Sequence, residues 1–121
     1  MNFNKVMVVD DSPTELHMVV DILKRHDVSN IVTASNGAEA ITMAKDEKPD
    51  VILMDVVMPE MNGFMATRKI KKDPDTAGIP VIIISSKDQD TDKVWGKRQG
   101  ADEYLTKPVQ ENELVKVLES L

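Results

Sequence analysis

The chain has 121 residues, of which 41% are hydrophobic and 3% aromatic, so we expect a single domain over residues 1–121 with a core of aliphatic side chains. The absence of cysteine excludes disulfides and thiolate metal sites, and a net charge of −6 disfavours non-specific binding to nucleic acid or anionic lipid. No apolar stretch approaches the ~18 residues that span a bilayer, and residues 1–5 lack the pattern of a secretory signal, so we expect a cytoplasmic protein without membrane insertion.

The first half of the chain alternates between short apolar runs and helix-like segments. Residues 5–9 are a continuous apolar run, which is typical of a strand buried on both faces. Ser12 and Glu15 have the spacing of a helix capping box, with Pro13 at the first helical position. The next predicted elements are a strand around 31–33, a helix over about 37–46 with Ala40, Ile41 and Ala44 facing inward, and a strand over 51–54 that runs into Asp55.

The second half continues the alternation. A helix is predicted from 62–63 to about 72, closed ahead of Pro74, and the most apolar strand covers 81–84 and ends at Ser85. A helix over about 90–99 is weakened by Gly96, because glycine costs ~1 kcal/mol relative to alanine within a helix. A short strand over 103–105 follows, and a final amphipathic helix is marked by Leu114, Val117, Leu118 and Leu121.

Five repeats of strand and helix predict an α/β fold with a parallel sheet covered by helices on both faces. At this length a flavodoxin-like doubly wound sheet is favoured over a barrel, which needs ~200 residues or more. We therefore expect five parallel strands in the order 2-1-3-4-5 with five helices. Function in such sheets is found beyond the carboxyl ends of the strands.

The predicted strands end in chemically active residues. Asp10 and Asp11 follow the first strand, Asp55 the third, Ser85 ends the fourth, and Lys107 follows the fifth. Each of them has an ordinary structural explanation, since acids before a helix favour its dipole and a lysine before proline is a common turn. Because the ends of parallel strands share one edge of the sheet, however, the five side chains are expected to converge.

Three neighbouring carboxylates repel one another unless a cation lies between them. Mg²⁺ suits this set because it accepts a few hard oxygens and keeps several waters, and Mn²⁺ is a possible substitute. Ca²⁺ would require more oxygens, and Zn²⁺ would require His or Cys; His17 and His26 fall on the first helix, away from the strand ends. Asp55, alone on the third strand, is the best candidate for a nucleophile that attacks phosphorus, with Lys107 and Ser85 as donors to the phosphoryl oxygens.

In their order and intervals these residues resemble the receiver domains of bacterial response regulators, over essentially the full chain. The resemblance implies that Asp55 is the phosphoacceptor and that Asp11, Asp55 and the Val57 main-chain carbonyl hold Mg²⁺, with Asp10 contacting the metal largely through water. The matching residues are 8–12, Met54, Asp55, Met58, Pro59, Gly63, Ser85, Lys107 and Pro108.

The same resemblance implies a conformational switch. Lys107 would bind the phosphoryl group, Ser85 would swing toward it, and the rotamer of Tyr104 would follow that swing. The implied partners are a histidine kinase, or its phosphotransfer domain, and a downstream protein target. No DNA-binding domain follows, so we expect no contact with nucleic acid.

A narrower resemblance is to the single-domain regulators of twitching motility, which serve a chemosensory system that controls type IV pili. It rests on residues 10–15, 47–51 and 87–101, and above all on the unusual stretch 94–101. In that stretch Trp95 could pack on the sheet edge, with Gly96 allowing close approach. Alternatively, it could anchor a partner surface made of Lys93, Trp95, Lys97, Arg98 and Tyr104.

Several alternatives stay open. The chain could serve another chemotaxis-type pathway, or drain phosphate from a shared kinase. An aspartyl-phosphate phosphatase of the haloacid-dehalogenase type would place two acids two residues apart after the first strand and carry a cap, whereas Asp10 and Asp11 are adjacent. A flavodoxin-like electron carrier would need a Ser/Thr/Gly-rich loop there. We expect no enzyme activity beyond self-catalysed phosphotransfer and autodephosphorylation.

Overall fold

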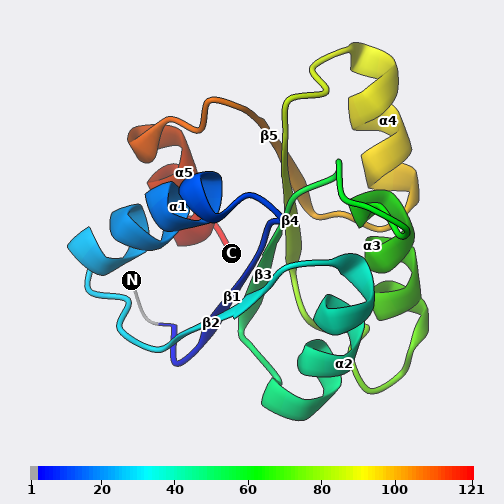
Figure 1. The fold of residues 1–121 in the computed structure, drawn as a ribbon, viewed down its shortest axis with the longest axis horizontal. Helices are drawn as coiled ribbons and strands as arrows, with labels where there is room; N and C mark the ends of the chain where they lie inside the picture. Colours follow the sequence, from blue (N-terminus) through cyan, green and yellow to red (C-terminus); the bar gives the residue numbers. More distant parts are fainter. Residues whose placement is uncertain (1–2) are drawn as a thin grey trace.

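Five strands and five helices alternate along residues 3–121, the part of the chain that the computed structural model describes (Figure 1). Met1 and Asn2, which begin the segment where we expect no secretory signal, lie outside it. None of the helices in the described range is long and apolar enough to cross a membrane. In chain order the elements are β1 (Val6–Val9), α1 (Pro13–Arg25), β2 (Ile31–Ala34), α2 (Gly37–Glu47), β3 (Val51–Met54), α3 (Gly63–Lys72), β4 (Val81–Ser85), α4 (Asp90–Arg98), β5 (Glu103–Thr106) and α5 (Glu111–Glu119).

All five strands form one parallel sheet in the order β2-β1-β3-β4-β5, which confirms the predicted fold. Val6 at the start of β1 lies opposite Ile31 of β2 and Val51 of β3, so these three strands run in step. Helices α1 and α5 cover one face of the sheet, and α2, α3 and α4 cover the other (Figure 1). The strand order reverses between β1 and β3, and the acidic residues lie there.

The central strands are apolar throughout because both of their faces are buried. Val8 of β1 and Leu53 of β3 belong to the core on the α1/α5 side, together with Leu23 and Leu114 of those helices. Their chain neighbours face the opposite way and pack with residues of α2 and α3. That second cluster includes Met7, Val9, Ile52, Met54, Ala40, Ala44, Ala66 and Ile70. Side chains of a strand alternate between faces, so a single continuous run builds both cores.

Only half of the predicted capping box at the start of α1 forms. The Ser12 hydroxyl accepts a hydrogen bond from the backbone N–H of Glu15 at 3.4 Å, as a capping residue does. The Glu15 carboxylate, however, lies 2.9 Å from the Lys107 ammonium, and the Ser12 N–H donates to Asp10 Oδ1 at 2.9 Å instead. The charged partner attracts the carboxylate more strongly than a backbone amide does.

The structure refines two of the predicted helices. Ile41 of α2 packs against its core cluster, as predicted, although it is only partly buried. Helix α5 ends at Glu119, and Leu121 lies beyond it with 48% of its surface exposed. The predicted helix therefore stops two residues before Leu121.

Candidate functional site

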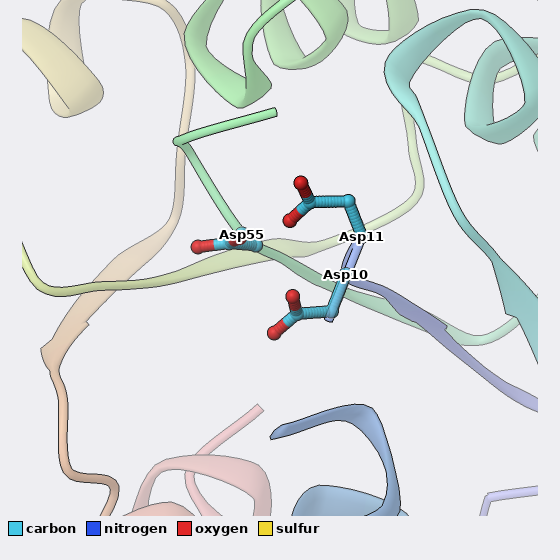
Figure 2. A group of neighbouring side chains, drawn as sticks. All are labelled: Asp10, Asp11 and Asp55. Carbon is cyan, nitrogen blue, oxygen red and sulfur yellow. The ribbon is translucent and has the colours of Figure 1, made fainter. Parts of the chain in front are cut away.

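Three carboxylates meet where β1 and β3 end side by side (Figure 2). Asp10 and Asp11 follow β1, and Asp55 follows β3, held by a hydrogen bond from its N–H to the Val9 carbonyl at 2.9 Å. One oxygen from each acid lies within 4.8 Å of the others. Asp10 and Asp55 are buried, at 5% and 6% exposure, whereas Asp11 is open to solvent. The parallel pairing of the two strands therefore gathers the acids that the sequence predicts at this edge.

Burial of Asp55 makes its charge costly. Burial, and then the charge of Asp10, raise the pKa of Asp55 from 3.8 to about 6, and the Lys107 ammonium only partly opposes this rise. A cation or another positive group in the site would strongly stabilise the ionised form of such a buried carboxyl group. The donor set is purely oxygen, which is the chemistry that Mg²⁺ prefers.

Lys107 reaches into the acidic cluster from the loop after β5. Its ammonium nitrogen lies 3.2 Å from Asp55 Oδ1, 3.1 Å from Asp10 Oδ2 and 2.9 Å from Glu15 Oε2. Burial works against the charged form of the lysine, but the hydrogen bonds to Glu15 and Asp10 and the charge of Asp55 raise its pKa above the ordinary value. Lys107 thus stays an ammonium held beside the Asp55 carboxylate.

Glu15 is the site residue that the sequence analysis assigned to a different role. Its position in the first turn of α1 suggested a cap, while the structure places its carboxylate on Lys107, 92 residues away. The available signal was its position in the first turn of the helix that follows Asp10 and Asp11, close to the edge of the sheet where the strands end.

Ser85 and Tyr104 are joined through the backbone of Lys87. Ser85 is fully buried, and its hydroxyl accepts a hydrogen bond from the Lys87 N–H at 3.1 Å. The Tyr104 hydroxyl donates to the Lys87 carbonyl at 2.7 Å, and its ring lies 6.5 Å, centre to centre, from Phe64. Burial raises the pKa of the Tyr104 phenol. Ser85 and Tyr104 thus share Lys87 as a hydrogen-bond partner.

The loop between β3 and α3 packs tightly beneath Asp55. The Gly63 N–H donates to the Val56 carbonyl at 2.9 Å, and a Cβ on Gly63 would lie 1.9 Å from the Asp55 carbonyl oxygen. Only glycine fits at that distance. Val57, whose carbonyl we expect to bind metal, lies in this loop with its side chain 57% exposed.

The structure divides the predicted partner surface between two faces of α4. Trp95 and Arg98 face α3 and line a groove between the two helices. Lys97 lies on the other side, 3.5 Å from Glu103 of β5. Gly96 lies against Tyr104, where a Cβ would come within 2.9 Å of the ring. Trp95 itself is 49% exposed.

The two histidines lie outside the strand-end cluster. His17 is exposed on α1, and His26 at the end of α1 lies 2.9 Å from the Glu111 carboxylate of α5. Neither belongs to the acidic group around Asp55.

Comparisons with known proteins agree with this arrangement. A family model for the response regulator receiver domain matches residues 6–119. The chain is 52% identical over 117 residues to protein PilH of Pseudomonas aeruginosa, which covers 97% of this chain and 96% of that protein. It is similar to the solved structure of chemotaxis protein CheY4 of Vibrio cholerae, with a TM-score of 0.88, 31% identity and 98% of each chain covered.

A second solved structure is the receiver domain of sensor histidine kinase PA1611 from P. aeruginosa, which has a magnesium ion coordinated in its active site cleft. The TM-score is 0.87 at 25% identity, with 96% of this chain and 94% of that chain covered. The sheet order, the acids at its switch point and a family match over nearly the whole chain lead to one assignment. The chain belongs to the response regulator receiver domain family.

Proposed function

We propose that the chain is a free-standing receiver, one domain over residues 1–121, that accepts a phosphoryl group on Asp55. The observation that carries this proposal is the Asp55 carboxylate, buried beside two other acids and 3.2 Å from the Lys107 ammonium. An Asp55 oxygen attacks the phosphorus of a phosphohistidine, the P–N bond breaks, and the imidazole keeps the electron pair and takes up a proton. The product is an acyl phosphate on Asp55.

Asp10, Asp11 and Asp55 fit a magnesium ion, because they offer three carboxylates within 4.8 Å and no softer ligand. The Val57 carbonyl would complete the protein's share, with Asp10 acting largely through water and Mn²⁺ as a substitute. The bound ion supplies neutralisation of charge on the phosphoryl oxygens. The magnesium ion in the PA1611 receiver domain supports this assignment.

Lys107 and Ser85 serve the transferred group. Lys107 donates from its ammonium to a phosphoryl oxygen once it is drawn from its present carboxylate partners. Ser85 turns its hydroxyl toward the same group, releasing the Lys87 N–H, and Tyr104 responds through Lys87. The phosphoryl group is lost again when water attacks phosphorus and the Asp55 carboxylate leaves, a reaction that the same residues promote without another enzyme.

We also propose that the chain acts in the chemosensory control of type IV pili and twitching motility, in the cytoplasm. Support comes from the 52% identity with protein PilH over 97% of this chain and from the distinctive residues 94–101. The phosphodonor is a histidine kinase or its phosphotransfer domain, and the output is contact with a downstream protein.

The phosphorylation proposal is tested with a small acyl or phosphoramidate donor in the presence of Mg²⁺. We expect one phosphoryl group per chain, localised to Asp55 by mass spectrometry and absent after Asp55→Asn or in EDTA. Asp46→Asn, an exposed acid on α2, serves as the matched control and should label like the native chain. Failure of the native chain to accept label would end the proposal.

The pathway is tested separately by expressing the chain in a P. aeruginosa strain that lacks PilH and measuring twitching zones. We expect the native chain to restore the zone diameter and Asp55→Asn to fail at equal expression. A native chain that labels normally but leaves motility unchanged would overturn the pathway and leave the phosphorylation chemistry intact.

A further inference from the structure

A groove between α3 and α4, on the far side of α4 from Lys97 and Glu103, is not used by the phosphorylation chemistry. Its volume is about 570 Å³, and we call it the α3–α4 groove. Its walls carry two exposed apolar side chains, Met65 and Trp95, each 49% exposed. Phe64 also lines it and is buried. Met65 and Trp95 therefore place exposed apolar surface on both helices of the same groove.

All charged residues that line the α3–α4 groove are basic, although the chain carries a net charge of −6. Five of the 15 basic residues line it or its continuation toward α4, and no acid lines either part; they are Arg68, Lys69, Lys71, Lys72 and Arg98. Lys71 has a structural role, since it lies 2.9 Å from Asp102 and donates to the Ile79 carbonyl at 2.7 Å. The other four have no ion-pair partner within residues 3–121.

The helix dipole accounts for only part of this pattern. Lysines in the last turn of α3 stabilise its carboxyl end, which explains Lys69 and Lys72. Arg68 lies before that turn and repels Lys72 at a spacing of four residues. Neither the dipole nor helix propensity explains why the only tryptophan is half exposed beside these cations. Exposed tryptophan, methionine and arginine together are the composition of a protein-binding surface.

We infer that the α3–α4 groove binds an acidic segment of a partner protein, with an apolar side chain of that segment seated between Met65 and Trp95. The lining runs from Asn62, the N-cap of α3, to Lys72, its last residue, a length of about 15 Å. That length suits four or five residues of extended chain, at roughly 3.3 Å each, more than one compact anion. Several carboxylates along the segment would meet the separate cations of the two helices.

Other anions fit the α3–α4 groove less well. Phosphate is usually bound by the free N–H groups at a helix N-terminus, whereas the cations here gather toward the carboxyl ends of α3 and α4. A nucleic acid strand would need successive aromatic platforms, and Trp95 is the one exposed aromatic ring of the groove. This inference goes beyond the proposed function and does not require phosphorylation of Asp55.

The test begins with a random peptide display library selected on the unphosphorylated chain. We expect enriched peptides to carry two or more acidic residues around an apolar or aromatic one. Synthetic peptides of the enriched sequence should shift the emission of Trp95, which reports on this groove alone because the chain has one tryptophan. Binding should weaken steeply with added salt.

The decisive variant is Arg68→Glu with Arg98→Glu, compared with Lys24→Glu and Lys116→Glu. The control pair changes the net charge equally and lies on α1 and α5, across the sheet, where neither lysine has an ion-pair partner among the described residues. We expect a loss of affinity of about tenfold or more in the groove variant and less than about twofold in the control. If the reversed pair does not fold, as judged by circular dichroism, Arg68→Gln with Arg98→Gln replaces it.

Three outcomes would overturn the inference. The first is an enriched set without acidic residues, or no enrichment over the groove variant. The second is tighter binding of inorganic tripolyphosphate or a labelled single-stranded oligonucleotide than of the selected peptide. The third is a dimer of the native chain in sedimentation that the groove variant loses, since the occupant would then be a second copy of the chain.

Discussion

Replacing Asp55 by asparagine should stabilise the metal-free chain, although it removes a charged group that lies 3.2 Å from a lysine. Burial and the charge of Asp10 raise the pKa of Asp55 from 3.8 to about 6. The folded chain therefore keeps a proton on Asp55 over a pH range in which the unfolded chain has released it. The stabilising contribution of Asp55 is full below about pH 3.8 and is lost as the pH rises through about 6.

The magnitude follows from the two pKa values. They differ by about 2 pH units, and each unit is equivalent to about 1.4 kcal/mol, so ionised Asp55 costs the folded state about 3 kcal/mol. The asparagine side chain of the variant carries no charge at any pH. Asp55→Asn should therefore exceed the native chain in free energy of unfolding by about 3 kcal/mol at pH 8 and by only about 1 kcal/mol at pH 4.5.

The assay is urea unfolding in EDTA at both pH values, followed by circular dichroism and by the emission of Trp95. Addition of Mg²⁺ should narrow the difference at pH 8, because a ligand that binds only the folded native chain stabilises it. Asp21→Asn, an exposed acid on α1, should change stability by less than about 0.5 kcal/mol. Equal stability of the native chain and Asp55→Asn in EDTA at pH 8, or a difference that does not vary with pH, would refute the reasoning.

Three further substitutions test other features of the site and core. Glu15→Gln removes one carboxylate partner of Lys107 and should speed labelling by about two- to fivefold, since an exposed ion pair is worth up to about 1 kcal/mol; slower labelling would contradict this. Gly96→Ala should lower stability by about 1 kcal/mol, although alanine favours helix, because its Cβ would meet the Tyr104 ring at 2.9 Å; the signals of this single tyrosine in NMR spectra should shift. Thr67→Val should raise the free energy of unfolding by about 1 kcal/mol, since the buried Thr67 hydroxyl has no hydrogen-bond partner in the described chain.

Each of these has a matched control. Glu113→Gln changes an exposed acid of α5 and should leave the labelling rate unaltered. Gly78→Ala introduces a Cβ into open space and should not lower stability. Thr76→Val removes a buried hydroxyl that donates to the Ile70 carbonyl at 2.6 Å, and it should destabilise the chain by about 1–2 kcal/mol, opposite in sign to Thr67→Val.

The helical period alone could have shown that the residues of the predicted partner surface lie on two different faces of α4. Residues two apart on a helix point in nearly opposite directions, so Lys93 and Lys97 could not share a face with Trp95. The partners of each face still required the structure. Trp95 faces α3, which precedes it in the chain by more than twenty residues, and the basic rim there comes mostly from α3 itself.

What the sequence determined by itself was the alternation of elements and the edge where function lies. Strands buried on both faces must be apolar throughout, and parallel strands must end at one edge, so Asp10, Asp11, Asp55 and Lys107 could be grouped from their positions in the chain. These features depend on short-range periodicity and on one rule of topology.

The tertiary structure alone decided how the grouped side chains are partnered. Glu15 binds Lys107 across 92 residues and leaves its capping role, because a nearby ammonium outweighs a backbone amide. The α3–α4 groove lies between two helices on one face of the sheet. The distance between these helices depends on how their side chains pack. Both features depend on contacts between segments that are far apart in the chain. Local sequence patterns do not predict how close such segments come to one another.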